Sequence, residues 1–219
     1  MSEANEAWTT RWREGRTGFH QEDVNAHLIE HWPSTVDASA KRVLVPLCGM
    51  SLDLLWLHKQ GHHVVGFELS SLAIEQFFAA MGAQPETTHQ GPFKVHRWEG
   101  VELWEGDFFE ITPDALPLLD AWYDRAAIVA LSPDLRRRYI ETIWGLLHPR
   151  APGLALTFAY PQAEMSGPPY SVSENDLRTA CQDLFEVNPL ACVDMTEGNR
   201  WSLSEVLKPV FAVRGLIKS

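Results

Sequence analysis

Short apolar runs recur along the chain and predict strands buried inside a sheet. Residues 42–46 (RVLVP) and 63–68 (HVVGFE) are apolar at most positions, which is typical of a parallel strand covered on both faces. The stretch 85–106 is less regular, although 93–97 and 101–105 can pair as strands. The remaining expected strands are 118–123, 154–159, 187–193 and 210–217.

Amphipathic stretches between the apolar runs predict helices. Ser70 can cap a helix. After it, apolar side chains recur at spacings of three and four, at Ile74, Phe77, Phe78 and Met81. The run Ser132-Pro133-Asp134 offers a capping hydroxyl, a proline at the first helical position and an acid in the first turn. The expected helices are 5–14, 24–32, 50–59, 71–81, 133–147 and 174–184.

The alternation of strand and helix signals over about 170 residues predicts an α/β fold with a mostly parallel, doubly wound sheet and helices on both faces. A length of 219 residues fits a single domain, residues 1–219. Such sheets bind ligands at the carboxyl ends of their strands. The loops that follow Pro46, Glu68 and Tyr123, and those around Asp107 and at 161–170, are therefore the places to look for chemistry.

Composition narrows the choice of partners. The formal net charge is −11, which disfavours nucleic acid and anionic lipid, because both require a concentrated basic surface. No apolar run reaches the roughly 18 residues of a membrane span. The acidic first residues contain no export signal, and three widely spaced cysteines fit neither a disulfide framework nor a zinc cluster. We therefore expect a cytoplasmic protein that acts on a small molecule.

The first loop, Pro46-Leu47-Cys48-Gly49, joins a strand to a helix where a nucleotide-like ligand would lie. It contains one glycine and no following lysine, so it is neither G-x-G-x-x-G nor a P-loop. This argues against a pyrophosphate and hence against NAD and ATP. A nucleoside without phosphates stays open, and an ordinary strand–helix turn fits the spacing equally well.

Two acids follow the next strand ends. The carboxylate of Glu68 can accept hydrogen bonds from both ribose hydroxyls, or it can be a solvent-exposed acid. Asp107, followed by Phe108, suits an adenine ring, because the carboxylate accepts from the exocyclic amine and the aromatic edge packs on the base. The alternative for this pair is a turn with its aromatic residues in the core.

Arg125 follows a further strand and can pair with a ligand anion or with a neighbouring acid of the protein. Other chemistries find weaker support. The nine histidines show no H-E-x-x-H or comparable metal spacing, so we expect no metal. No G-x-S-x-G is present, and Cys48 fits a packing residue better than a nucleophile.

Taken together and in order, five segments resemble the thiopurine S-methyltransferase family in its bacterial form, from about residue 8 to residue 170. The matching segments are Trp8-x3-Trp12-x2-Gly15-x3-Phe19-His20-Gln21, Pro46-Leu47-Cys48-Gly49, Gly61-His62-x-Val64-Val65-Gly66-x-Glu68-x-Ser70, Asp124-Arg125-x-Ala127-x-Val129-Ala130 and Gly167-Pro168-Pro169-Tyr170. One departure is Met50, where many members carry lysine.

The resemblance implies a Rossmann-like class I methyltransferase fold with S-adenosylmethionine as methyl donor and no metal. It implies a helical lid over about residues 1–35 that carries Trp12 over the donor. The donor-binding residues that it implies are Trp12, Leu47, Glu68 and Arg125, with Trp8, Asp107 and Phe108 in second place. Phe19, Pro168 and Tyr170 would line the acceptor pocket, and Arg125 would hold an acceptor anion. Arg200-Trp201 aligns only loosely with a segment of this pocket.

The implied reaction moves a methyl group to the sulfur of a small aromatic or heterocyclic thiol such as a thiopurine. Aromatic thiols are largely thiolates near neutral pH, so the protein would contribute mainly by positioning the reactants. Selenium or tellurium compounds, thiocyanate or halide are alternative acceptors for the same fold. A nucleotide-binding oxidoreductase or a silent binding module is the alternative from another class. A monomer is expected.

Overall fold

The computed structural model describes residues 3–217; the ends of the predicted domain, residues 1–2 and 218–219, lie outside the described residues. The helices are α1 (Glu3–Arg13), α2 (Ala26–Thr35), α3 (Asp53–Lys59), α4 (Ser71–Ala80), α5 (Pro133–Leu146) and α6 (Glu174–Cys181). The strands are β1 (Arg42–Val45), β2 (His63–Glu68), β3 (Glu86–Gln90), β4 (Phe93–Trp98), β5 (Val101–Glu105), β6 (Ala121–Arg125), β7 (Pro152–Leu156), β8 (Phe185–Asp194) and β9 (Leu207–Gly215).

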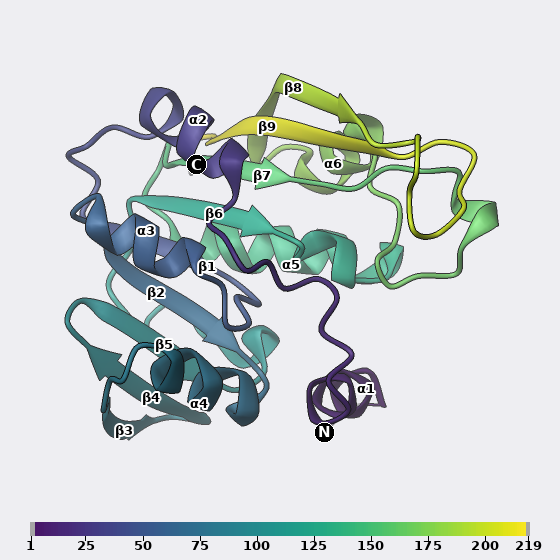
Figure 1. The fold of residues 1–219 in the computed structure, drawn as a ribbon. Helices are drawn as coiled ribbons and strands as arrows, with labels where there is room; N and C mark the ends of the chain where they lie inside the picture. Colours follow the sequence, from purple (N-terminus) through teal and green to yellow (C-terminus); the bar gives the residue numbers. More distant parts are fainter. Residues whose placement is uncertain (1–2, 218–219) are drawn as a thin grey trace.

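The strands form one sheet in the order β3-β4-β5-β2-β1-β6-β7-β9-β8 (Figure 1). The five central strands, β5 to β7 in this order, pair in parallel. Strands β3 and β4 extend one edge and β9 and β8 the other, each by antiparallel pairing. Because β2 and β6 lie on opposite sides of β1, the order of the strands reverses there. This switch point is where parallel sheets bind ligands.

Two hydrophobic clusters cover the two faces of the sheet, as predicted. Along β1, Val43 and Val45 belong to one cluster and Leu44 to the other, which is the period-two alternation of a strand buried on both sides. The first cluster includes residues of α5 and α6, and the second includes residues of α2, α3 and α4. The doubly wound arrangement is therefore confirmed.

Local capping fixes where the helices start. The Ser70 hydroxyl accepts from the backbone N–H of Ala73 at the start of α4. Ser173 and Asp176 form a capping box at the start of α6. Pro133 occupies the first turn of α5, as expected. These ends set the positions of the loops that precede each helix.

Several predicted strand boundaries are wrong. The predicted strand 118–123 begins later and runs through Asp124 and Arg125, because both polar side chains find partners inside the protein. Strand β7 begins at Pro152 and ends at Leu156, three residues before the predicted end. Strand β3 was not predicted, since all five of its residues are polar and it lies at the edge of the sheet, paired only with β4.

The N-terminal segment runs past the carboxyl ends of the central strands. Figure 1 shows α1 standing off the sheet and joined to α2 by an extended stretch of chain. Helix α1 contacts α4, and α2 contacts β7. Within residues 3–217, every helix falls short of the length and apolar content that crossing a bilayer requires.

Candidate functional site

A cavity of about 670 Å³ opens at the carboxyl ends of the central strands. This volume is within the usual range of small-molecule pockets, roughly 300–1,000 Å³. Its walls combine the loops after β1, β2, β5 and β6 with the N-terminal segment and the chain around β9. Of the predicted site residues, the cavity brings together Trp8, Trp12, Phe19, Leu47, Glu68, Asp107, Phe108, Arg125 and Pro168.

The first loop is shaped for close approach by another group. Leu47 and Gly49 both have positive φ angles, 48° and 56°. A Cβ atom at Gly49 would lie 3.2 Å from the ring of Trp12, so glycine permits the aromatic ring to lie against the loop. Trp12 is buried as a result, with 4% of its surface exposed.

Glu68 is held in place by backbone donors at the end of β2. Its Oε2 accepts from the N–H of Gly49 at 2.8 Å, and its Oε1 accepts from the N–H of Ser70 at 2.7 Å. Burial raises the pKa of the Glu68 carboxyl, and these N–H groups act in the opposite direction. An ionised carboxylate has about four acceptor positions, so capacity remains for a ligand hydroxyl.

Asp107 and Phe108 lie after β5 and differ in their environments. The Asp107 carboxylate accepts from Phe109 N–H at 2.9 Å and from the Asn5 side-chain amide of α1 at 2.8 Å. Phe108 is buried, with its ring edge-on to Phe67 at a centroid distance of 5.1 Å. Phe108 is thus a core residue that also lines the cavity. Packing in the core and contact with a ligand are therefore not exclusive for this residue.

Arg125 joins three separate segments. Its Nε donates to Asp53 Oδ2 at 2.8 Å, Nη2 to the Ser51 hydroxyl at 2.9 Å and Nη1 to the Phe19 carbonyl at 3.1 Å. The pairing with a protein acid, one of the two alternatives for this residue, is therefore present. Among the described residues these bonds leave two of the five guanidinium N–H groups for other partners, and Arg125 also lines the cavity.

Aromatic rings of the N-terminal segment form the wall beside the first loop. The ring of Phe19 lies edge-on to Trp12 at 5.5 Å and to Trp8 at 5.7 Å. Such edge-to-face pairs stabilise the segment that carries them by roughly 0.5–1.5 kcal/mol each. Three aromatic residues of one N-terminal stretch therefore act as a unit.

A second wall combines Phe158, which follows the carboxyl end of β7, with the chain around Trp201. Phe158 and Trp201 pack together at 4.9 Å, and the guanidinium of Arg200 lies 4.3 Å above the Trp201 ring. Arg200 Nη2 also donates to the Gly18 carbonyl at 2.9 Å, which joins the C-terminal part to the N-terminal segment. All three side chains line the cavity. Tyr170 is not among the residues that line it; its N–H donates to the Val129 carbonyl at 2.7 Å.

Cys48 lies inside the protein and is unsuited to nucleophilic chemistry. Burial and the nearby Glu68 carboxylate raise its pKa well above the ordinary thiol value, so it stays protonated. Cys181 is also buried, and burial raises its pKa to about 12. Cys192 of β8 is exposed. The interpretation of Cys48 as a packing residue therefore agrees with its environment.

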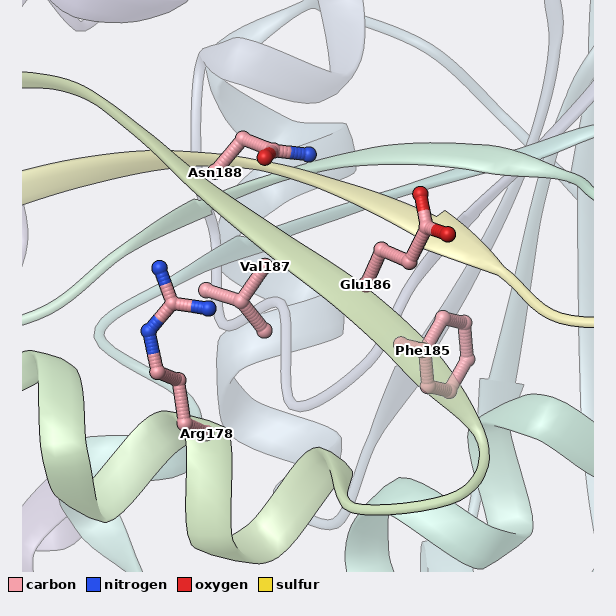
Figure 2. A pocket seen from close by; sticks show the side chains of 5 residues that line it. All are labelled: Arg178, Phe185, Glu186, Val187 and Asn188. Carbon is pink, nitrogen blue, oxygen red and sulfur yellow. The ribbon is translucent and has the colours of Figure 1, made fainter.

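A smaller hollow of about 270 Å³ lies between α6 and β8 (Figure 2). Its lining residues are Arg178, Phe185, Glu186, Val187 and Asn188. Arg178 is ion-paired with Glu174 at 2.7 Å, and none of the predicted site residues takes part. This hollow therefore plays no part in the candidate site.

One cluster contradicts the expectation that the histidines have no metal-ligand spacing. Among the described residues, His27, Glu30 and His31 of α2 bring three potential ligand atoms within 4.8 Å of one another. The sequence His-x-x-Glu-His carries this spacing in reverse order to the H-E-x-x-H motif and therefore does not match that motif.

Several solved structures share this architecture. One comes from work on converting a disulfide bond into a thioacetal group during echinomycin biosynthesis. The match covers 99% of this chain and 93% of that chain (TM-score 0.67, 16% identity). Another is the 1,6-didemethyltoxoflavin-N1-methyltransferase of Burkholderia thailandensis, solved with S-adenosylhomocysteine (97% and 87% covered, TM-score 0.64, 17% identity).

Relatives found by sequence have a higher sequence identity to this chain than these structures have. A protein of Pseudomonas fluorescens Pf0-1 named thiopurine S-methyltransferase is 41% identical to this chain over 216 residues, which cover 96% of this chain and 99% of the relative. A protein of the same name from Pseudomonas syringae pv. tomato is 48% identical over 165 residues, which cover 75% of each chain. The family model described as thiopurine S-methyltransferase matches residues 3–213. The chain therefore belongs to the thiopurine S-methyltransferase family and has the Rossmann-like fold of class I S-adenosylmethionine-dependent methyltransferases.

Proposed function

We propose that this protein transfers the methyl group of S-adenosylmethionine to the sulfur of a small aromatic or heterocyclic thiol such as a thiopurine. The observation that supports this most directly is the family match over residues 3–213. The cavity agrees with it, because it gathers the donor-binding residues implied by the sequence at the switch point of the sheet.

The donor would be held by the loops after β1, β2 and β5. Glu68 keeps acceptor capacity for a ribose hydroxyl, and Asp107 offers carboxylate oxygens for an exocyclic amine. Leu47 and Phe108 supply apolar contact, while Trp12 and Trp8 cover the cavity from α1 as part of a lid formed by about residues 1–35. Bound there, the donor supplies an electrophilic methyl group on a sulfonium.

The acceptor would lie between Phe19 and the segment around Pro168, with Tyr170 supporting that segment from behind. Apolar rings exclude water from a thiolate there and so strengthen its attraction to a positive charge. Arg125 has N–H groups left to hold an acceptor anion. An acidic thiol is already largely ionised near neutral pH and therefore needs no general base. Positioning of this kind can lower the remaining barrier by up to roughly 7–11 kcal/mol.

The function is tested by methylation assays with labelled S-adenosylmethionine and thiophenol or 6-mercaptopurine. We expect stoichiometric formation of the S-methyl product and of S-adenosylhomocysteine. A panel with selenite, tellurite, thiocyanate and iodide distinguishes the alternative acceptors. Tight binding of S-adenosylhomocysteine without transfer to any thiol would contradict the proposal and identify a silent binding module.

Replacing Glu68 with glutamine is expected to weaken binding of S-adenosylhomocysteine by about 10–150-fold. This is the scale of 1.5–3 kcal/mol for a hydrogen bond to a charged group. Calorimetric titration measures this affinity, and Glu68→Ala should weaken the binding of S-adenosylhomocysteine at least as much. The matched control is Glu105→Gln, which changes the same residue type at the register partner of Glu68 in β5. Equal affinity of the Glu68 and Glu105 variants would remove Glu68 from the donor site.

Replacing Trp12 with alanine is expected to raise the KM for the donor and to lower kcat, because the segment that closes over the donor loses its contact with Gly49 and Phe19. Trp12→Phe, which keeps a ring, should recover part of both. Trp98→Ala, which removes a half-buried tryptophan of β4, is the control for loss of a tryptophan elsewhere. If deletion of residues 1–14 left the kinetics intact, these residues would not form a lid.

We also propose that the protein works as a monomer in the reducing cytoplasm. The three cysteines, all free, support the reducing compartment. Size-exclusion chromatography with light scattering tests the oligomeric state.

A further inference from the structure

We propose that His27, Glu30 and His31 of α2 form a binding site for a divalent late transition-metal ion such as Zn²⁺, Ni²⁺ or Cu²⁺. The function proposed above assigns no role to these three side chains. The site would hold the ion through two imidazole nitrogens and one carboxylate oxygen, with the remaining coordination positions open to water.

The helix places the three side chains together. Residues three and four apart share one face of a helix, so His27, Glu30 and His31 stack along α2. The side chain of Asn25 caps this first turn by accepting from the N–H of His27 at 3.0 Å. The two imidazole rings lie nearly parallel, with centroids 5.9 Å apart and planes 13° apart. The helical spacing thus brings the three ligand atoms within 4.8 Å of one another.

The distances are close to those of a coordinated ion. Glu30 Oε2 is 3.6 Å from His31 Nε2 and 3.9 Å from His27 Nδ1. Metal–nitrogen and metal–oxygen bonds of about 2.0–2.2 Å in tetrahedral geometry separate two ligand atoms by about 3.3–3.5 Å. The Glu30 side chain is 67% exposed, so it can move the few tenths of an ångström that are needed.

Two of the ligand atoms are buried without a partner. His27 Nδ1 and His31 Nε2 are shielded from solvent, and neither has a hydrogen-bond partner among residues 3–217. A buried polar atom that lacks a partner is costly, and most such atoms in folded proteins are paired. Both unpaired nitrogens belong to the same cluster as an exposed carboxylate. A metal ion satisfies all three groups at once.

The ligand set decides the class of ion. Imidazole nitrogens suit Zn²⁺, Cu²⁺ and Ni²⁺, whereas Mg²⁺ and Ca²⁺ require oxygen ligands. Two histidines and one glutamate also form the protein ligand set of zinc sites that keep a position open. Because His27 additionally lines the cavity, the ion would lie beside the cavity wall.

The test is calorimetric titration of the untagged full-length protein with ZnCl₂. We expect one saturable site per chain. Glu30→Gln and His31→Gln should each weaken it by at least about tenfold, the lower end of what loss of a partner behind a ligand costs. His89→Gln, which removes an exposed histidine of β3, is the matched control and should bind like the unaltered protein. Equal affinity in all three variants, or no saturable site, would overturn the proposal.

A spectroscopic count of ligands gives a second readout. In the Cu²⁺-loaded protein, electron paramagnetic resonance should show hyperfine coupling to two imidazole nitrogens, and in His31→Gln to one. Circular dichroism checks that each variant is folded. A spectrum of the unaltered protein without the two-nitrogen pattern would contradict the site. Both readouts are independent of methyl transfer, so failure of either function leaves the other testable.

Discussion

Replacing Asp53 with alanine is expected to lower the free energy of unfolding by about 3–5 kcal/mol, the usual cost of removing one partner of a buried ion pair. The Asp53 carboxylate accepts from Arg125 Nε at 2.8 Å, from the Tyr123 hydroxyl at 3.1 Å and from Asn25 N–H at 2.8 Å. Only 2% of the Asp53 side chain and 13% of that of Arg125 are exposed. Without the carboxylate, a guanidinium charge stays inside the protein unpaired.

Urea unfolding followed by circular dichroism measures this loss. The control is Glu141→Ala, which breaks an Arg–Glu pair whose glutamate side chain is 52% exposed and should cost no more than about 1 kcal/mol. Asp53→Asn should lie between the two, since an amide cannot accept from donors on both sides. A loss for Asp53→Ala as small as that of the control would show that Arg125 finds another partner.

The pH dependence of stability should reveal Asp124. Burial raises the pKa of this carboxyl from 3.8 to about 6, although it accepts from the Tyr139 hydroxyl at 2.8 Å. In the unfolded chain the group ionises near its ordinary value, so between these two pKa values the folded state binds more protons than the unfolded state. Folding is therefore favoured by Asp124 at low pH, and this contribution is lost as the pH rises through about 6.

We expect the unfolding free energy of the unaltered protein, relative to Asp124→Asn, to fall by about 2–3 kcal/mol between about pH 4 and pH 7. Asparagine keeps an acceptor for Tyr139 and does not titrate. Denaturant titrations at several pH values measure the difference. Asp183→Asn, at an exposed turn, is the control for replacing an aspartate elsewhere in the protein. A difference that grew with pH would mean that the pKa of Asp124 is lowered in the folded protein.

The central sheet could be predicted because its strands are apolar on both faces. The hydrophobic pattern gave wrong strand boundaries where the surroundings of a residue, and not its polarity, decide whether it lies in a strand. Asp124 and Arg125 read as loop residues, yet both continue β6 because Tyr139 and Asp53 satisfy them inside the protein. The polar strand β3 has no apolar face to signal it, and its existence depends on pairing with β4.

The candidate site was predictable where residues directly follow strands. Glu68 and Asp107 lie in the cavity because the topology of the sheet fixes where strand ends meet. The contributions of Asn5, Arg200 and Trp201 depend on how distant segments pack, and periodicity carries no information about that. The resemblance to a family supplied Trp12 and Phe19, which spacing alone would not have placed beside the first loop.

The distribution of the thiols has a consequence for a protein proposed to handle thiol compounds. Such compounds form mixed disulfides with accessible cysteines when they oxidise. Cys48 and Cys181 are buried and stay protonated, whereas Cys192 is exposed on the edge strand. Cys48 borders the cavity, but its buried, protonated thiol is a poor nucleophile. Oxidative damage from the substrate would therefore collect on Cys192, which lies outside the cavity lining.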